Sequence, residues 1–200
     1  MSEINALCVY CGSSPGTDPA FVSAAQSFGK ILAENNVRLV YGGGSVGLMG
    51  ALANAVLDHG GAATGIIPEF LTRKERPGQR TQELIVTGDM HERKRTMFER
   101  ADGFVALPGG IGTLEEVVEQ LTWAQLGRHK KPILIANING YWDPLLELIA
   151  HMRTQQFVPA SLRVDYLVAN RVDDILPKMR DAARGVTEAD KAMAVPAERL

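Results

Sequence analysis

The sequence predicts a single-domain α/β protein with a Rossmann-like, doubly wound parallel sheet. Short β-branched runs alternate with helical patterns along most of the chain. Strands and helices in strict alternation favour right-handed crossovers and a parallel sheet covered on both faces. Glycine-rich segments also follow the first, second and fifth expected strands, where the ligand-binding loops of such a sheet gather.

The expected elements follow one another without an interdomain linker. The expected strands are residues 7–10, 37–41, 64–67, 84–86, 104–107, 133–136 and 166–168. The expected helices are residues 20–34, 48–58, 89–100, 114–126, 144–155 and 172–183. We expect a nucleotide-binding domain over residues 1–184 and a polar C-terminal tail over residues 185–200.

Composition excludes several classes of function. The 200 residues are 46% hydrophobic, enough for one core, and the formal charge of -2 argues against a general nucleic-acid binder. No apolar run is long enough to span a membrane, and the N-terminus lacks the basic region of a signal peptide, so we expect a cytoplasmic protein. Cys8 lies in a strand and should point away from Cys11, and the histidines are scattered, so we expect no metal.

The most informative motif is P-G-G-I-G-T-L-E-E at residues 108–116, which follows an apolar strand and opens a helical pattern. A glycine turn at a helix start leaves N–H groups unpaired at the positive end of the helix dipole, which favours a bound phosphate. Thr113 can add a hydroxyl donor, and Glu116 places a carboxylate one turn further on. The alternative is a capping box from Thr113 to Glu116, but capping alone does not explain Gly109, Gly110 and Gly112.

A second glycine loop permits a rival interpretation. Gly42, Gly44 and Gly47 match G-x-G-x-x-G, and Glu69 lies about where a ribose-binding acid belongs, so a nicotinamide-dependent oxidoreductase is one alternative. That fingerprint normally follows the first strand, however, and here it follows the second. Tight packing of helix on sheet explains the glycines better.

Two cations stand out in the basic segment after the expected fourth strand. On a helix from Asp89, Arg93 and Lys94 flank the apolar stripe, whereas Arg95 points away. A cation beside a buried face needs an anionic partner, either a ligand phosphate or a catalytic carboxylate, unless its stem reaches water. Glu75 ends a capping-box match that begins at Thr72, and it would be an ordinary surface acid on this evidence.

Three motifs together resemble the Lonely-guy family of phosphoribohydrolases, which release cytokinin bases from riboside 5'-monophosphates. They are G-G-G-S-V-G-L-M-G at residues 42–50, M-H-E-R-K at residues 90–94 and the turn at residues 108–116. Members were often labelled "possible lysine decarboxylase". Decarboxylation is improbable here, because it needs an electron sink such as pyridoxal phosphate and Lys94 is the only lysine near the expected site.

The resemblance implies that Arg93 and Glu116 are the catalytic pair. It also implies homodimers or larger assemblies, no cofactor, and a nucleoside 5'-monophosphate substrate. The substrate-binding residues that it implies are Glu75, Arg93, Lys94, Gly110, Ile111, Gly112, Thr113, Leu114, Glu115, Glu116 and Thr122.

The expected reaction is hydrolysis of the N-glycosidic bond to free base and ribose 5-phosphate. Glu116 would stabilise oxocarbenium character and orient or deprotonate water, while Arg93 would keep Glu116 ionised and position the substrate. Two alternatives stay open: a broader nucleosidase that acts on AMP and other nucleotides, and a nucleotide or cofactor carrier that cleaves nothing.

Overall fold

The computed structural model describes residues 3–75, 82–158 and 165–186, with the side chains of residues 73–75 excepted. Its centre is a seven-stranded sheet in the order β4-β3-β2-β1-β5-β6-β7, in which every pairing is parallel. The strands are β1 (Ala6–Tyr10), β2 (Arg38–Tyr41), β3 (Ala63–Pro68), β4 (Glu83–Thr87), β5 (Gly103–Ala106), β6 (Ile133–Ala136) and β7 (Leu167–Ala169).

Helices connect the strands, as parallel pairing requires. They are α1 (Pro19–Glu34), α2 (Gly47–Asp58), α3 (Glu69–Glu75), α4 (Met90–Glu99), α5 (Ile111–Gln125), α6 (Asp143–Thr154) and α7 (Ile175–Arg184), with 3-10 turns η1 (Ile138–Gly140) and η3 (Val172–Asp174). The start of α1 shows the local chemistry: Asp18 Oδ1 accepts the Ala20 N–H at 2.8 Å, and Pro19 occupies the first turn.

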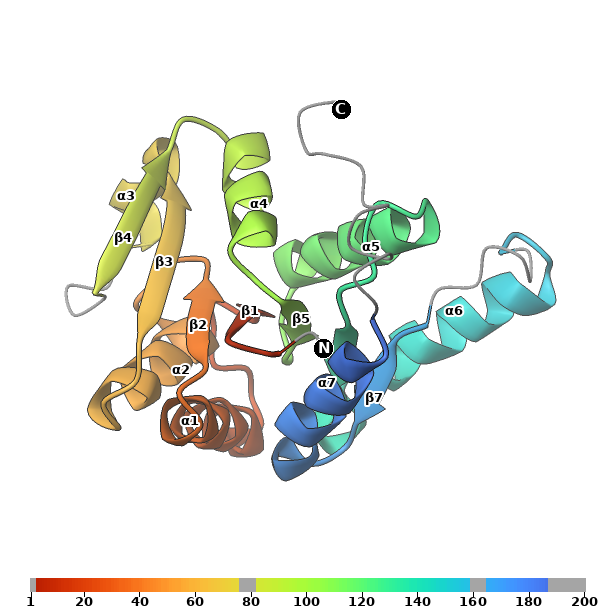
Figure 1. The fold of residues 1–200 in the computed structure, drawn as a ribbon, viewed down its shortest axis with the longest axis horizontal. Helices are drawn as coiled ribbons and strands as arrows, with labels where there is room; N and C mark the ends of the chain where they lie inside the picture. Colours follow the sequence, from red (N-terminus) through yellow and green to blue (C-terminus); the bar gives the residue numbers. More distant parts are fainter. Residues whose placement is uncertain (1–2, 76–81, 159–164, 187–200) are drawn as a thin grey trace.

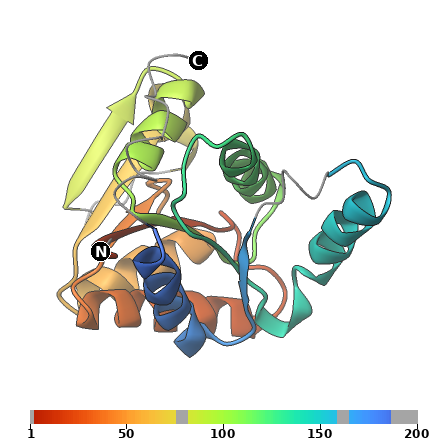
Figure 2. The same ribbon diagram turned by 45° about the vertical axis from the view of Figure 1, so that its right-hand side comes forward.

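Two hydrophobic cores lie on opposite faces of the sheet. Figures 1 and 2 show α1, α2 and α7 on one side and α4 and α5 on the other. Strand β1 serves both cores, because successive side chains point to opposite faces. Leu7 and Val9 join the core under α1, α2 and α7, whereas Cys8 and Tyr10 join the core under α4 and α5. The fold is therefore the predicted Rossmann-like, doubly wound α/β architecture.

The strand order reverses direction between β1 and β5. From β1 the chain builds the sheet outward through β2 and β3 to β4, and then α4 returns it to β5 beside β1. Crevices at such a switch point, outside the carboxyl ends of the strands, are where ligands bind in open α/β sheets. The turn at residues 108–110 follows β5 at this place.

Each expected strand overlaps an observed one, and the main differences concern helices. Helix α3 was not expected; Thr72 lies inside it and donates to the Glu69 carbonyl, so the predicted capping box from Thr72 is wrong. Helix α5 begins at Ile111, three residues before the expected start. The segment expected as one helix at residues 172–183 divides into η3 and α7.

The last described helix, α7, ends at Arg184, and the predicted tail falls almost wholly outside the described residues. No helix in the described parts of the chain is long and apolar enough to cross a membrane.

Candidate nucleotide site

The N-terminus of α5 forms the floor of the candidate site. The first intrahelical bond joins the Leu114 N–H to the Gly110 carbonyl at 3.0 Å, so the preceding N–H groups of the first turn have no helical acceptor. Gly110 is the N-cap and makes no side-chain cap bond. The alternative of a capping box from Thr113 is therefore wrong: Thr113 lies inside the first turn and is buried.

Glycines of this turn divide into two kinds. Gly109 is required by packing, because a Cβ there would collide with Thr113 Oγ1. At Gly110 and Gly112 a Cβ would meet no atom within 4 Å, and neither has a positive φ. Packing within the described chain and backbone strain explain neither glycine. Gly110 is also the N-cap, where glycine is favoured, and both positions leave room for the backbone to approach a ligand closely.

Beside the turn lies a buried ion pair between α4 and α5. Arg93 Nη1 lies 3.4 Å from Glu116 Oε1, and the two residues are 7% and 9% exposed. Arg93 Nε also donates to the Ile66 carbonyl in β3, at 3.1 Å. Its guanidinium lies against Gly42, where a Cβ would collide with Nη2. One glycine of the second loop thus makes room for Arg93.

The local sequence explains why α4 presents this arginine. Asp89 caps the helix by accepting the Glu92 N–H at 2.8 Å, and Glu92 Oε2 accepts the Gly88 N–H at 2.7 Å. With the start of α4 fixed, Arg93 shares the buried side with Met97, and Arg95 is exposed as predicted.

Lys94 makes a second contact between the same helices. Its Nζ lies 2.7 Å from Glu115 Oε1 and 2.9 Å from Glu119 Oε1. Burial opposes the charge on Lys94, but hydrogen bonds to these two carboxylates outweigh it and raise the pKa of the amine. The sequence left Glu115 and Glu116 indistinguishable by periodicity, whereas in the structure Glu116 is buried against Arg93 and Glu115 is half-exposed against Lys94.

Other predicted residues lie further out. Ile111 is 81% exposed at the mouth of the turn, and Leu114 is half-buried behind it. Thr122 is exposed two turns beyond Glu116, and its hydroxyl donates to the Val118 carbonyl at 2.8 Å, so this chain alone does not bring it to the ion pair. Glu75 ends α3, and its side chain lies outside the described part of the chain.

The second glycine loop shows packing where a dinucleotide site would need free donors. The Leu48 and Met49 N–H groups at the start of α2 both donate to the Gly12 carbonyl, at 3.0 and 3.3 Å. A Cβ at Gly47 would collide with the Ser13 main chain, and one at Gly50 with the Ser45 carbonyl. This geometry supports the packing interpretation over nicotinamide binding.

Sequence reasoning missed several polar residues near the site. Gln120 lies one turn beyond Glu116 on the same buried face, and neither of its amide atoms has a partner among the described residues. Beneath the pair, burial raises the pKa of the Cys8 thiol and of Tyr10, with the Glu116 charge adding to both. Tyr141 approaches the glycine turn from the loop after β6. No local pattern reveals these contacts.

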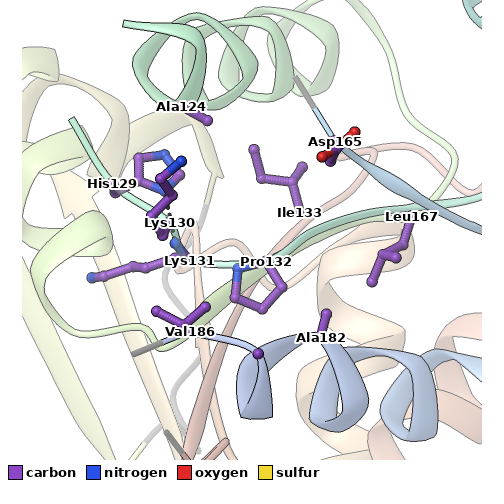
Figure 3. A pocket seen from close by; sticks show the side chains of 11 residues that line it. Ala124, His129, Lys130, Lys131, Pro132, Ile133, Asp165, Leu167, Ala182 and Val186 are labelled. Carbon is purple, nitrogen blue, oxygen red and sulfur yellow. Dashed lines mark hydrogen bonds between the residues drawn. The ribbon is translucent and has the colours of Figure 1, made fainter. Parts of the chain in front are cut away.

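A cavity of about 400 Å³ lies at the opposite edge of the sheet, beside the first residues of β6 and β7 (Figure 3). Burial lowers the pKa of Lys131 there to about 8, but its Nζ already donates to the Phe98 carbonyl at 2.6 Å. His129 Nδ1 accepts the Lys131 N–H at 3.1 Å. These groups stabilise the loop after α5, and neither Arg93 nor Glu116 lines the cavity.

The fold and its polar cluster define a class: a Rossmann-like α/β protein with an open helix N-terminus and a buried arginine–glutamate pair at the switch point. The family described as "Possible lysine decarboxylase" matches residues 49–179, more than half of the chain. Similar relatives are the probable cytokinin riboside 5'-monophosphate phosphoribohydrolase LOGL1 of Oryza sativa subsp. japonica (43% identity; 91% of this chain, 82% of the relative) and LOG3 of Arabidopsis thaliana (41%; 91% and 85%). The chain belongs to the LOG family.

Solved structures agree on the fold. A Moco carrier protein from Chlamydomonas reinhardtii aligns with a TM-score of 0.69 at 21% identity, over 90% of this chain and 98% of its own. A molybdenum cofactor binding protein from Rippkaea orientalis aligns with a TM-score of 0.67, also at 21% identity, over the same shares. At this identity the likeness concerns architecture only.

Proposed function

We propose that this protein hydrolyses the N-glycosidic bond of cytokinin riboside 5'-monophosphates, giving the free N6-modified adenine and ribose 5-phosphate. Relatives that carry this activity in their names are 41–43% identical over at least 90% of the chain. The observation that carries the proposal is the placement of the Arg93–Glu116 pair beside the open N-terminus of α5.

The phosphate would rest on the N–H groups of Gly110, Ile111, Gly112 and Thr113. This anchor holds the sugar by a group remote from the bond that breaks, so binding energy is used for orientation. Glu116 would then face the anomeric carbon, stabilise positive charge as the bond lengthens, and orient or deprotonate the attacking water.

Arg93 supplies the counter-charge for a carboxylate that is almost out of water. Its guanidinium does not release protons in proteins, so it serves as a fixed charge and a positioning group. Lys94 would act beside the site by holding Glu115 and Glu119, and its bonds to α5 keep the two helices in register.

Homo-oligomerisation and a cytoplasmic location form part of the proposal. An exposed stripe on α5 contains Ile111, Val118 and Leu126, which are 81%, 44% and 74% exposed, and a second copy would cover it. Cys8 and Cys11 are both free thiols, as in a reducing compartment.

Replacing Glu116 by Gln tests the chemistry. The amide keeps the shape of the side chain but cannot act as a base, so kcat should fall by at least about 100-fold. Isopentenyladenosine monophosphate is the substrate, and free base is measured by chromatography. Glu99→Gln, at an exposed position on α4, is the matched control and should retain turnover. Near-normal turnover by Glu116→Gln would contradict the assignment.

The same assay with AMP separates the alternatives. A kcat/KM for AMP equal to that for the N6-modified nucleotide would indicate a broader nucleosidase. Binding of both nucleotides with no release of base would indicate a carrier.

A further inference from the structure

The loop between β6 and α6 reaches across to the glycine turn after β5. Tyr141 Oη donates a hydrogen bond to the Gly109 carbonyl at 2.5 Å, which joins segments 32 residues apart. Gly109 directly precedes the N-cap of α5. The carbonyl that Tyr141 contacts therefore belongs to the same peptide group as the Gly110 N–H, the first of the N–H groups that would hold a phosphate.

The Tyr141 ring is fixed on two sides. It packs edge-to-face against Phe21, with ring centroids 5.3 Å apart, and against Trp142 at 5.0 Å. The backbone beneath it is also fixed, because Asn137 Oδ1 accepts the Trp142 N–H at 2.8 Å and Asn139 Nδ2 donates to Asp18 Oδ2 at 2.9 Å. These contacts hold the Tyr141 hydroxyl in a defined position.

Planarity of the peptide group determines what this hydrogen bond does. In a trans peptide the C=O of one residue and the N–H of the next point in opposite directions. Because the Gly109 C=O points at Tyr141, the Gly110 N–H points away from the Tyr141 hydroxyl. A donor on the carbonyl also polarises the peptide, which makes the N–H on its far side a stronger donor.

Among the described residues, few other contacts constrain the peptide between Gly109 and Gly110. Gly109 and Gly110 have no side chains to limit rotation of their peptide, and Gly110 has open space around its Cα. The neighbouring peptide groups have their own fixed points: the Gly12 N–H donates to the Pro108 carbonyl at 3.0 Å on one side, and the Leu114 N–H donates to the Gly110 carbonyl at 3.0 Å on the other. Without the Tyr141 hydroxyl, the peptide between Gly109 and Gly110 could rotate.

We propose that Tyr141 is a positioning residue that orients the Gly109–Gly110 peptide so that the Gly110 N–H faces the substrate phosphate. This inference rests on the proposed function for the identity of the substrate. The orientation of the N–H group itself concerns any phosphate bound at the start of α5.

Replacing Tyr141 by Phe removes the hydroxyl and keeps the ring between Phe21 and Trp142. The KM for the nucleotide should rise about five- to tenfold while kcat stays within twofold, because the lost interaction acts equally on ground and transition states. The dissociation constant of inorganic phosphate, measured by titration calorimetry, should rise by a similar factor. A thermal melt should shift by only a few degrees, as expected for one hydrogen bond.

Tyr166→Phe is the matched control, because it removes a hydroxyl next to β7 at the far side of the sheet. It should leave phosphate affinity and KM unchanged. Unchanged phosphate affinity in Tyr141→Phe, equal losses in both variants, or a loss confined to kcat would each overturn the inference. The phosphate titration does not need turnover. If the protein did not hydrolyse the nucleotide, the proposed function would be refuted, and the titration would still test the role of Tyr141.

Discussion

At the scale of single residues, the glycines of the α5 turn distinguish structure from function. Gly109 has a steric reason within the chain and Gly110 is the N-cap, where glycine is favoured, whereas nothing in the described structure accounts for Gly112. A glycine in a helix costs up to about 1 kcal/mol relative to alanine, so an unexplained one indicates another demand on that position. A phosphate held by backbone N–H groups would make that demand, because the methyl group of an alanine would stand between the phosphate and those N–H groups.

Gly112→Ala tests this separation. The free energy of unfolding should stay the same or rise by up to about 1 kcal/mol, since a Cβ meets open space and alanine favours the helix. The KM for a nucleoside monophosphate should rise about tenfold, equivalent to 1.4 kcal/mol of lost binding. Denaturant titration and steady-state kinetics measure the two effects. Gly185→Ala, at the end of α7, is the control and should change neither quantity. An unchanged KM in Gly112→Ala would refute phosphate binding at the start of α5.

The hydrophobic periodicity of the sequence predicted most of the strands and helices. Strands such as β1 and β6 are continuous apolar runs buried on both faces, a pattern typical of parallel sheets. Helix α3 was missed because it has seven residues and a run of charged side chains. The start of α5 was misplaced because its N-cap, Gly110, has no side chain to make a capping hydrogen bond. Sequence rules for helix starts look for a polar side chain at that position.

The geometry of the candidate site could be predicted only where its residues lie close together in the sequence. The turn at residues 108–116 has its donors and its carboxylate on one element, so its chemistry is readable. Pairings across elements, such as Arg93 with Glu116 or Tyr141 with Gly109, depend on how helices and loops meet over the sheet. The position of Arg93 beside an apolar stripe indicated that a partner exists, and the resemblance supplied which one.

The loop between α5 and β6 contains a buried histidine that should make stability depend on pH. His129 is 2% exposed between Phe98 and Phe104, and burial lowers its pKa from 6.5 to about 4. Above pH 6.5 the residue is neutral in both folded and unfolded states. As pH falls from 6.5 toward 4, the unfolded chain binds the proton before the folded chain does, so the free energy of unfolding decreases. The total decrease is about 3 kcal/mol once the pH is below both pKa values.

His129→Asn should remove this part of the acid sensitivity. Asparagine can accept the Lys131 N–H as Nδ1 does, and it does not titrate. The loss of unfolding free energy between pH 7 and pH 4 should therefore be smaller in the variant, although packing is lost at both pH values. His151→Asn, exposed on α6, is the control and should keep the wild-type pH dependence. Equal pH dependence in His129→Asn and wild type would contradict the prediction.

The position of Thr122 raises the question of assembly. The resemblance implies that this residue contacts the nucleotide, yet it lies on the outward face of α5, about 9 Å along the helix from Glu116. It shares that face with the exposed Val118 and Leu126. If two copies pack through this stripe, Thr122 of one copy can reach the site of the other, and one surface serves both assembly and binding.

Replacing Val118 by Glu tests the assembly. In an isolated chain the substitution is at an exposed position and should change the free energy of unfolding by less than about 0.5 kcal/mol. In a homo-oligomer it places charges in an apolar interface, so the assembly should dissociate and lose activity. Light scattering after size-exclusion chromatography gives the mass. A wild-type chain that is monomeric at micromolar concentration would refute the proposal at once.

Mixed assemblies show whether Thr122 acts across the interface. Homo-oligomers of Glu116→Gln should be inactive, and Thr122→Arg should be impaired if Thr122 lines a site. When the two variants are co-expressed with different tags and purified as hybrids, a site built from two chains regains one intact pair, with Glu116 from the threonine variant and Thr122 from the glutamate variant. Activity should then recover to near half of the wild-type value per hybrid dimer. A site built within one chain regains nothing, because each chain still carries its own defect, and in that case Thr122 has no role across the interface.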